Sequence, residues 1–350
     1  MPLKHFKNKG GKNMSIAIDL NGGDFAPKAV IKGIELALKL NYIRREELIC
    51  LGTQEAIATA QQNKKMAGLL FLECSEAILM ADGKEIIAKK KKSTIAMGIK
   101  LLKIRDGMSE ENIAPIDSLV SAFVSAGNTA AMVIWGTIIL SRIKRRLKPA
   151  IAVPIPNESG PCLLLDSGAI HDAQAVDLAN CAIMGSIYAR EIWQLKEPIV
   201  KLLNIGGESG KGNDTLKLAD QLLRQEASVN YQGNIEGDKI FTDQVNVIVC
   251  PGEIGNNTLK VSEGVIKLVK DKLGFIWKLF TFFYGHHKKT DYEEVGGAIL
   301  LGVNGIEIIA HGKSRPLAIA NAIRRAKMEV EADIVNKIKT GMKIMEIDEE

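Results

Sequence analysis

The stretch MSIAIDLNGGDFAPKAV, residues 14–30, decides the fold class of this chain. Its first half is mostly apolar and β-branched, which is typical of a buried strand. A Gly-Gly turn follows, and Pro27 stands where the first turn of a helix tolerates proline. The stretch therefore predicts a strand that runs through a tight turn into a helix over about residues 27–40.

The same order of strand, turn and helix recurs along the chain. Apolar runs predict further strands at 47–52, 71–80, within 118–140, and at 150–156, 162–168, 199–206, 245–252 and 306–312. Helices are expected after Thr53, from Ser93, and over 174–193, 214–226, 256–272 and 315–337. Continuous apolar runs, rather than strict alternation, indicate strands that are buried on both faces. We therefore expect an α/β fold, a three-layer sandwich with a largely parallel sheet.

The composition is that of an ordinary globular protein, with 46% hydrophobic and 25% charged residues among 350. These values exclude a disordered or fibrous chain. The formal net charge is +5, but four units of it come from Lys4, Lys7, Lys9 and Lys12. The rest of the chain is close to neutral, so no nucleic-acid partner is expected.

The charge distribution also sets the expected boundaries. We expect a disordered basic tail over residues 1–13, a single α/β domain over 14–340 and an acidic tail over 341–350. No apolar stretch reaches the length of about 18 residues that a transmembrane helix needs, and no secretory signal follows the basic start. The five cysteines are widely spaced and lack a CxxC pair, which indicates reduced core thiols. These features predict a cytoplasmic protein.

Five turns at predicted strand ends share a Gly-rich composition. In parallel sheets, ligands bind at the carboxyl ends of strands, beside helix N-termini. We therefore expect these turns to form one shared rim of backbone amides that holds an anion. The turns are NGGD (21–24), SAGNT (125–129), DSGAIHD (166–172), NIGGESGKGN (204–213) and PGEIGNN (251–257).

The segment GGESGKGN resembles a phosphate-binding P-loop only superficially. Three residues separate Gly206 from Gly210, and Gly212 stands where that loop has serine or threonine. The sequence also lacks GxGxxG after the first strand, HExxH and GxSxG, so no nucleotide, metal or serine-hydrolase site is indicated. What remains is Lys211 in a Gly-rich loop, either as a functional cation or as a solvated loop lysine.

The segment SAGNT places three polar side chains at a strand-to-helix junction. Ser125, Asn128 and Thr129 offer donors to an anion together with the first amides of the helix. The alternative is a helix N-cap with no further role.

Residues 275–284, FIWKLFTFFY, hold six of the seventeen aromatic residues of the chain. They predict an aromatic amphipathic insertion over 270–290 that is too short to span a bilayer but able to lie at its surface. The alternatives are a dimer interface or a core hairpin. The lysine run Lys89–Lys92 is either a solvated helix start or a contact for an acidic partner. The residues expected to contact the membrane are Phe275, Trp277, Phe280 and Phe283.

Taken in order, these segments resemble the phosphate acyltransferase (PlsX) family of bacterial phospholipid synthesis. The matching segments run collinearly from Met14 to about Lys327, so the resemblance is far more specific than any single motif. They are IDLNGGDFAPKAVIKG (18–33), KKKKST (89–94), VSAGNTAAM (124–132), LLLDSGA (163–169), AIMGSIYA (182–189), LLNIGGESGKGND (202–214), VNYQGNIEG (229–237), GNNTLKVSEG (255–264), GGAILLGVNG (296–305) and AHGKS (310–314).

The resemblance implies a soluble α/β homodimer with a fold similar to isopropylmalate dehydrogenases and phosphotransacetylases. It implies transfer of a fatty acyl group from acyl carrier protein to inorganic phosphate, giving acyl phosphate. Peripheral association with the membrane is also implied. No cofactor and no metal is expected.

The resemblance also implies roles for individual residues. Lys211 would orient phosphate and stabilise or protonate the departing thiolate, and Asn204 and Asn256 would donate to the developing oxyanion. The residues expected to bind phosphate or line the pocket are Ser125, Asn128, Thr129, Asp19, Gly22, Gly23, Asp24, Ser93 and Thr94.

Several positions depart from the family pattern. The family usually has other residues at Asn21, Ala130, Ile170, Pro251 and Glu253. The losses at Ile170 and Pro251 remove polar groups, and Glu253 adds a charge that disfavours a nearby anion. The alternative function is therefore a catalytically weakened paralogue that binds acyl carrier protein or membrane. A dehydrogenase of the same broad fold would show an arginine cluster and metal-binding aspartates, and neither is found.

Overall fold

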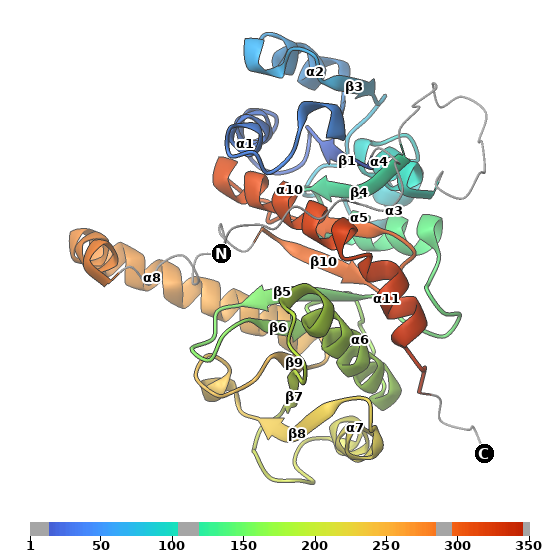
Figure 1. The fold of residues 1–350 in the computed structure, drawn as a ribbon, viewed down its shortest axis with the longest axis vertical. Helices are drawn as coiled ribbons and strands as arrows, with labels where there is room; N and C mark the ends of the chain where they lie inside the picture. Colours follow the sequence, from blue (N-terminus) through green and yellow to red (C-terminus); the bar gives the residue numbers. More distant parts are fainter. Residues whose placement is uncertain (1–13, 104–118, 285–295, 346–350) are drawn as a thin grey trace.

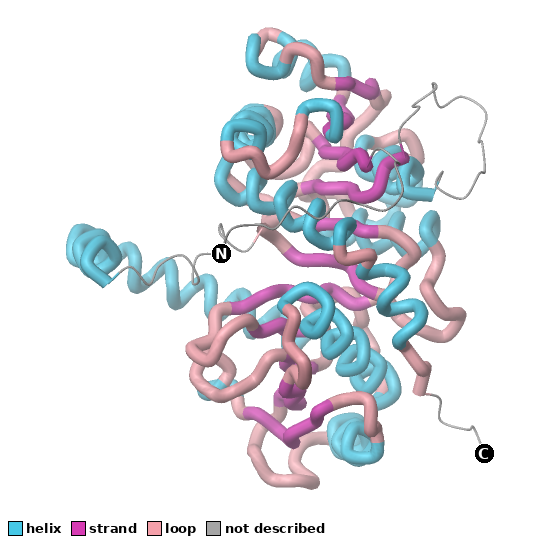
Figure 2. The backbone as a smooth tube through the Cα atoms, in the orientation of Figure 1, coloured by secondary structure: helices cyan, strands magenta, loops and turns pink. Residues whose placement is uncertain are grey.

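The computed structural model describes residues 14–103, 119–284 and 296–345, which form one continuous sheet with helices on both faces (Figures 1 and 2). The predicted basic tail, residues 1–13, lies outside the described residues. The eleven strands of the sheet follow the order β3-β2-β1-β4-β11-β10-β5-β6-β9-β7-β8. Their bounds are β1 (Met14–Asp19), β2 (Leu48–Gly52), β3 (Leu70–Glu73), β4 (Leu119–Ser125), β5 (Ala150–Ile155), β6 (Cys162–Leu165), β7 (Ile199–Leu203), β8 (Asn230–Ile235), β9 (Val247–Val249), β10 (Ala298–Leu301) and β11 (Ile306–Ile309).

The sheet contains two parallel blocks that run in opposite directions. Strands β3, β2, β1, β4 and β11 form the first block, and β6, β9, β7 and β8 form the second. Between them, β10 and β5 are antiparallel to each neighbour, so the direction is inverted on crossing them. The largely parallel sheet is confirmed. The prediction of one shared rim is wrong, because the carboxyl ends of the two blocks lie at opposite edges.

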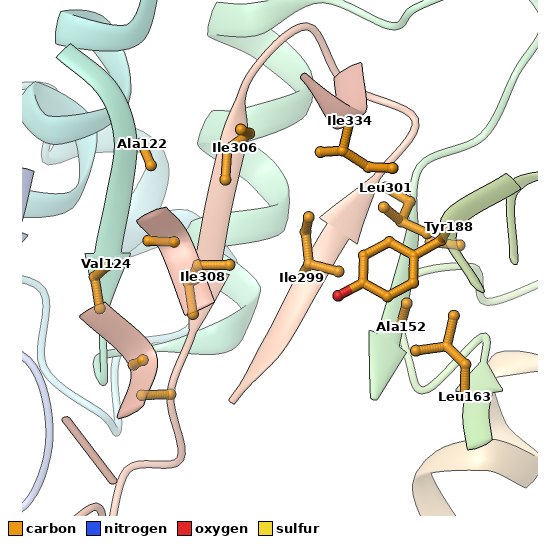
Figure 3. Close-up of a cluster of buried hydrophobic side chains, with 14 of the residues drawn as sticks. Ala122, Val124, Ala152, Leu163, Tyr188, Ile299, Leu301, Ile306, Ile308 and Ile334 are labelled. Carbon is orange, nitrogen blue, oxygen red and sulfur yellow. The ribbon is translucent and has the colours of Figure 1, made fainter. Parts of the chain in front are cut away.

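One face of the sheet carries a continuous apolar core. In the order of the sheet, buried side chains of the strands from β2 across to β7 join those of the covering helices in a single cluster. Figure 3 shows its centre, where Tyr188 and Ile334 lie over β10 and β5. The helices of this face include α1 (Lys28–Lys39), α6 (Ala175–Trp193), α7 (Asp214–Gln225), α10 (Pro316–Glu331) and α11 (Ile334–Gly341).

The opposite face carries two separate cores, divided at β5. Ile151 at the start of β5 belongs to the core of the first block, and Ile155 at its end belongs to the core of the second. The half-buried Val153 packs against both. The first core lies under α4 (Thr94–Lys103), α5 (Thr129–Trp135) and the π-helix η4 (Gly136–Leu140), and Leu259 of α8 (Gly252–Tyr284) packs on the second.

A buried polar network joins helices that cover different blocks. The Arg325 guanidinium of α10 donates to Glu329 at 2.7 Å and to the Tyr188 hydroxyl of α6 at 2.9 Å. The Tyr188 hydroxyl donates to the same Glu329 carboxylate at 2.8 Å. Because all three groups are buried, removing any one would leave the other two each short of one hydrogen bond in a medium of low polarity. The network therefore fixes α6 relative to α10.

Several expected elements differ from the structure. The strands β8 and β10 were not predicted, and the predicted strand 71–80 is only four residues long because the chain leaves the sheet after Glu73. The helix expected over 315–337 breaks at Asp333, which has a φ of 52°. The start of the predicted acidic tail is packed, since Met342 is buried and the Met345 amide donates to Asn180.

Other expectations hold. All five cysteines are buried and free, as predicted for core thiols. The helix expected over 256–272 is present but longer, because α8 continues through Tyr284. No helix in the described part of the chain combines the length and the apolar character needed to cross a bilayer. The remaining short helices are α2 (Gln54–Gln61), α3 (Lys84–Lys89), η1 (Arg45–Glu47), η2 (Lys64–Met66) and η5 (Gly237–Lys239).

Glu307 is a buried carboxyl in the central strand β11. Among the described residues neither of its oxygens has a hydrogen-bond partner, and it packs on the backbone of Gly136, where a Cβ would overlap it. Burial raises the pKa of Glu307 well above its ordinary value of 4.5. The group is therefore protonated in the folded protein but ionises in the unfolded chain above that value, so its cost to stability grows as the pH rises.

We predict that Glu307→Gln stabilises the protein increasingly as the pH is raised from 5 to 8. The variant keeps the shape of the side chain and removes a penalty that grows with pH, because only the unfolded chain ionises this group just above its ordinary pKa. Thermal unfolding of both proteins at matched pH values measures the difference. A difference in Tm that does not change with pH would contradict the burial of an unpaired acid at this position.

Candidate active site

The turns after β1, β4 and β11 pack against one another through their backbones. A Cβ added at Gly22 would lie 2.9 Å from the amide nitrogens of Ala126 and Gly127, so only glycine fits there. The Asp24 amide donates to the Gly312 carbonyl at 2.7 Å. Gly23 has a φ of 98°, and a Cβ added there would lie 2.9 Å from the Gly312 carbonyl oxygen. The predicted residues Gly22, Gly23 and Asp24 therefore form one rigid surface with the SAGNT turn.

Asp19 and Ser125 form the buried centre of this first group of turns. The Ser125 hydroxyl donates to the Asp19 carboxylate at 2.8 Å and accepts from the Gly127 amide at 3.0 Å. Burial raises the pKa of Asp19, and the hydrogen bond from Ser125, the nearby Thr94 hydroxyl and the Asn21 amide oppose that rise. The structure thus brings together Asp19, Ser125 and Thr94, and it pairs Ser125 with Asp19 rather than leaving its hydroxyl free.

Two of the predicted site residues are occupied by backbone contacts. Asn128 accepts from the Ala131 amide at 3.1 Å, which confirms the N-cap, and its amide group donates to the carbonyls of Leu79, Met80 and Asp82. Ser93 donates to the Lys90 carbonyl and accepts from the Ala96 amide. Both side chains hold the loop beside α5 in place, so a phosphate would have to displace these bonds to reach them. Thr129, at the first position of α5, is exposed.

The turns after β6, β9 and β7 form a second group at the other edge of the sheet. Leu165 and Leu202 both pair with Val249, so the three strands end side by side. The Asp166 carboxylate, which follows β6, accepts from the amides of Ile151 at 2.7 Å, Ala169 at 2.9 Å and Ile170 at 2.7 Å. Burial raises the pKa of Asp166, and these backbone amides oppose the rise. Asp166 therefore fixes the conformation of the DSGAIHD turn.

Polar side chains hold the loop that carries Lys211. The Asn204 amide donates to the Lys211 carbonyl at 3.0 Å, and the Asn234 amide donates to the Glu208 carbonyl at 2.8 Å. The Ser209 hydroxyl donates to Asp220 at 2.8 Å. The Lys211 side chain itself is half exposed, with its Nζ 4.0 Å from a Glu208 carboxylate oxygen. The loop is thus fixed while its ammonium group remains available to a ligand.

Helix α8 connects the two groups of turns. At its start, a Cβ on Gly168 would lie 3.7 Å from the Asn256 Cβ, so Asn256 faces the DSGAIHD turn. Two turns further on, a Glu263 carboxylate oxygen lies 3.9 Å from His311 Nε2, in the turn after β11. With a rise of about 1.5 Å per residue, these contacts are on the order of 10 Å apart along the helix. Residues of both groups of turns therefore contact the same stretch of α8.

Sequence reasoning assigned no role to two residues of this arrangement. His311 occurs in the AHGKS segment, inside the predicted strand 306–312, whereas the observed strand β11 ends at Ile309. Burial lowers the pKa of His311, while Glu263 opposes and Lys260 reinforces the shift. Asp166 likewise lies inside a predicted strand, 162–168, and follows the last residue of the observed β6. The signal that could have found both residues is a polar side chain at the carboxyl end of an apolar run.

The residues predicted to contact a membrane lie on the distal part of α8. Their backbone is helical, and this part of the helix projects away from the body of the molecule (Figure 1). The structure describes the backbone of these residues but not their side chains. Among the described residues, no group of three or more histidine, cysteine, aspartate or glutamate side chains is placed to hold a metal ion.

Comparison of the sequence with known proteins shows which family the chain belongs to. The family model described as "Fatty acid synthesis protein" matches residues 14–337. A phosphate acyltransferase of Pelotomaculum thermopropionicum is 38% identical, covering 95% of this chain and 96% of the relative. A phosphate acyltransferase of Thermoanaerobacter pseudethanolicus is 37% identical, covering 95% and 98%. The chain belongs to the phosphate acyltransferase (PlsX) family.

Solved structures show that the fold of this phosphate acyltransferase family member is shared more widely. A phosphotransacetylase of Staphylococcus aureus has a TM-score of 0.57 at 14% identity, covering 91% of this chain and 95% of its own. A branched-chain phosphotransacylase of Enterococcus faecalis has a TM-score of 0.52 at 11% identity, covering 91% and 100%. These likenesses concern the fold alone, and they confirm the expected phosphotransacetylase-like architecture.

The departures from the PlsX pattern have definite places in the structure. Asn21 accepts from the Thr53 amide at 2.9 Å and so links the first two strand ends. Ile170 is buried, and its amide donates to Asp166. Ala130 is exposed on α5, Pro251 is half-buried before α8, and Glu253 is exposed on the first turn of α8. Glu253 is thus the departure that puts a new charge beside the second group of turns.

Proposed function

We propose that this protein transfers a fatty acyl group from acyl carrier protein to inorganic phosphate, giving acyl phosphate for phospholipid synthesis. Its family membership makes it an acyltransferase of fatty acid and phospholipid synthesis. The observation that carries the finer proposal is that both groups of fixed polar turns contact one stretch of α8, which brings their polar residues near one another. Loop amides and a lysine are groups that bind a small anion, so they suit phosphate as the second substrate.

The reaction sets three requirements on the site. A phosphate oxygen attacks the thioester carbonyl carbon, a C–O bond forms, and the carbonyl oxygen becomes an oxyanion. The C–S bond then breaks, the carbonyl is restored, and the carrier thiolate takes up a proton. The site must therefore hold an anion, stabilise an oxyanion and neutralise a departing thiolate.

The structure supports a division of these tasks between the two groups of turns. Lys211 supplies the positive charge for phosphate and thiolate, and the exposed Asn256 donates to the oxyanion. Thr129 and the amides of the first group of turns would bind phosphate from the other side. Asn204 acts as a positioning residue, because its amide already donates to the Lys211 carbonyl.

The alternative is a weakened paralogue that binds acyl carrier protein or membrane without efficient catalysis. The exposed carboxylate of Glu253 favours it, because a like charge near the α8 N-terminus opposes phosphate binding. Acyl phosphate formation from acyl carrier protein and phosphate separates the two functions. Absence of the product with a protein that still binds the carrier would support the alternative.

We further propose that the aromatic end of α8 binds the membrane surface and that two chains form a homodimer. The projection of α8 from the body leaves this segment free to reach a lipid surface (Figure 1). Its sequence combines aromatic residues with flanking lysines, which favour anionic headgroups. Release into lipid would suit a product as apolar as a fatty acyl phosphate.

We predict that Lys211→Ala lowers kcat by about 100-fold or more, the scale of losing one preorganised electrostatic contact. Stability should change little, because the side chain is half exposed. Lys217→Ala is a matched control on the adjacent helix, where Lys217 lies 3.5 Å from Asp214. Acyl phosphate formation by the three proteins tests this. Equal rates for wild type and Lys211→Ala would remove Lys211 from the mechanism.

Peripheral binding to anionic vesicles is predicted to depend on the aromatic end of α8 and to weaken with salt, because surface electrostatics are screened. Trp277→Glu with Phe280→Glu should abolish co-sedimentation with vesicles. Light scattering on the same variant reports its oligomeric state. A variant that becomes monomeric or aggregates would show that these side chains form a dimer interface or core instead.

A further inference from the structure

The segment between η4 and β5 is the most one-sidedly charged part of the described chain. Residues 138–151 contain five basic residues and no acidic residue. Ile143 and Leu147 are buried, and the Ile143 amide donates to the Gly302 carbonyl at 2.8 Å, so the segment is held on the body. Arg142, Arg145 and Arg146 are exposed on its outer side. The segment is therefore a fixed, positively charged surface, which we call the basic ridge (residues 142–148).

A cavity of about 320 Å³ opens directly beside the basic ridge. Its lining includes the exposed Arg142 and the half-buried Lys148, together with Val133, Ala169 and the buried Ile170. One acidic residue, Asp172, also lines the cavity. This volume lies at the lower end of the range of about 300–1,000 Å³ that is usual for small-molecule sites. The cavity can therefore take a slender, partly apolar group whose outer end is anionic.

The cavity shares the DSGAIHD turn with the candidate active site. Ala169 and Ile170 belong to the turn that the Asp166 carboxylate fixes. The preceding residue of that turn, Gly168, faces Asn256 at the start of α8. A group that enters past the basic ridge would thus meet the site at the end where Asn256 lies.

We propose that the basic ridge docks the acidic surface of acyl carrier protein and that the cavity receives its phosphopantetheine arm. The arm is a chain with a phosphate at its base and a thioester at its tip, which matches a lining that is basic and partly apolar. This inference rests on the proposed function, since it names the surface through which that substrate is bound. The basic ridge lies on the opposite side of the molecule from the projecting end of α8 (Figure 1), so the carrier and a membrane would not compete for one face.

The lysine run beside α3 is the weaker candidate for this role. Residues 73–92 contain five basic residues but also four acidic ones, so their charges nearly cancel. Lys90 is paired with Asp82 at 2.7 Å. In the ridge, Lys148 is paired with Asp177 at 2.7 Å. The ridge segment itself has no acidic residue to offset its basic ones, so its own net charge is strongly positive.

The test compares charge reversal on the two basic surfaces. Arg142→Glu with Arg145→Glu should raise the Kd for holo acyl carrier protein at least about tenfold, because like charges would then face each other. Lys89→Glu with Lys91→Glu makes the same change in net charge and should leave the Kd within about twofold. Binding is measured by biolayer interferometry at low salt, and Tm values confirm folding, since all four side chains are exposed.

The outcomes separate this inference from the proposed function. Equal loss of binding in both variants, or loss only in the lysine variant, would overturn the docking surface. Wild type that forms acyl phosphate from acyl pantetheine but does not bind the carrier would also overturn it, while leaving the chemistry intact. Carrier binding that depends on the arginines, in a protein that forms no acyl phosphate, would support the surface and defeat the proposed reaction.

Discussion

The inversion of strand direction at β10 and β5 is the constraint on which the rest of the structure depends. Each of these strands is hydrogen-bonded to antiparallel neighbours, so the carboxyl ends of the two parallel blocks lie at opposite edges. Turns that would otherwise form one rim are separated. Helix α8 links them, because it contacts one group at Asn256 and the other at Glu263. The division of the core at β5 occurs on this same face.

Within each group of turns, a buried carboxyl group organises the backbone. Asp19 and Asp166 are almost fully buried, which by itself raises the free energy of their charged forms. Backbone amides and the Ser125 hydroxyl offset this cost by donating to the carboxylates. Because each oxygen has a donor, the turns have one well-defined conformation. The exposed groups Lys211, Asn256 and Thr129 are thus presented by a rigid frame, as an electrostatic mechanism requires.

Much of this could be predicted from the sequence, because apolar runs and Gly-rich turns reflect local physical rules. The strands β1, β4, β6 and β7 and the turns after them were predicted from these signals alone. Strand direction was not, because it depends on pairing between distant segments, and the short β10 carries little signal of its own. The bonds of Asn128 to the loop over residues 79–82 were hidden for the same reason. A sequence shows which side chain can donate, but not which distant carbonyl already accepts.

The central claim is that phosphate is the acyl acceptor and that it binds at the two groups of turns that contact α8. Its most direct test incubates the purified protein with acyl carrier protein loaded with a labelled fatty acid and with ³²P-phosphate. The account predicts a product that carries both labels and forms in equal amount with free carrier thiol. Free thiol together with unphosphorylated fatty acid would show that water is the acceptor, and that result would contradict the account.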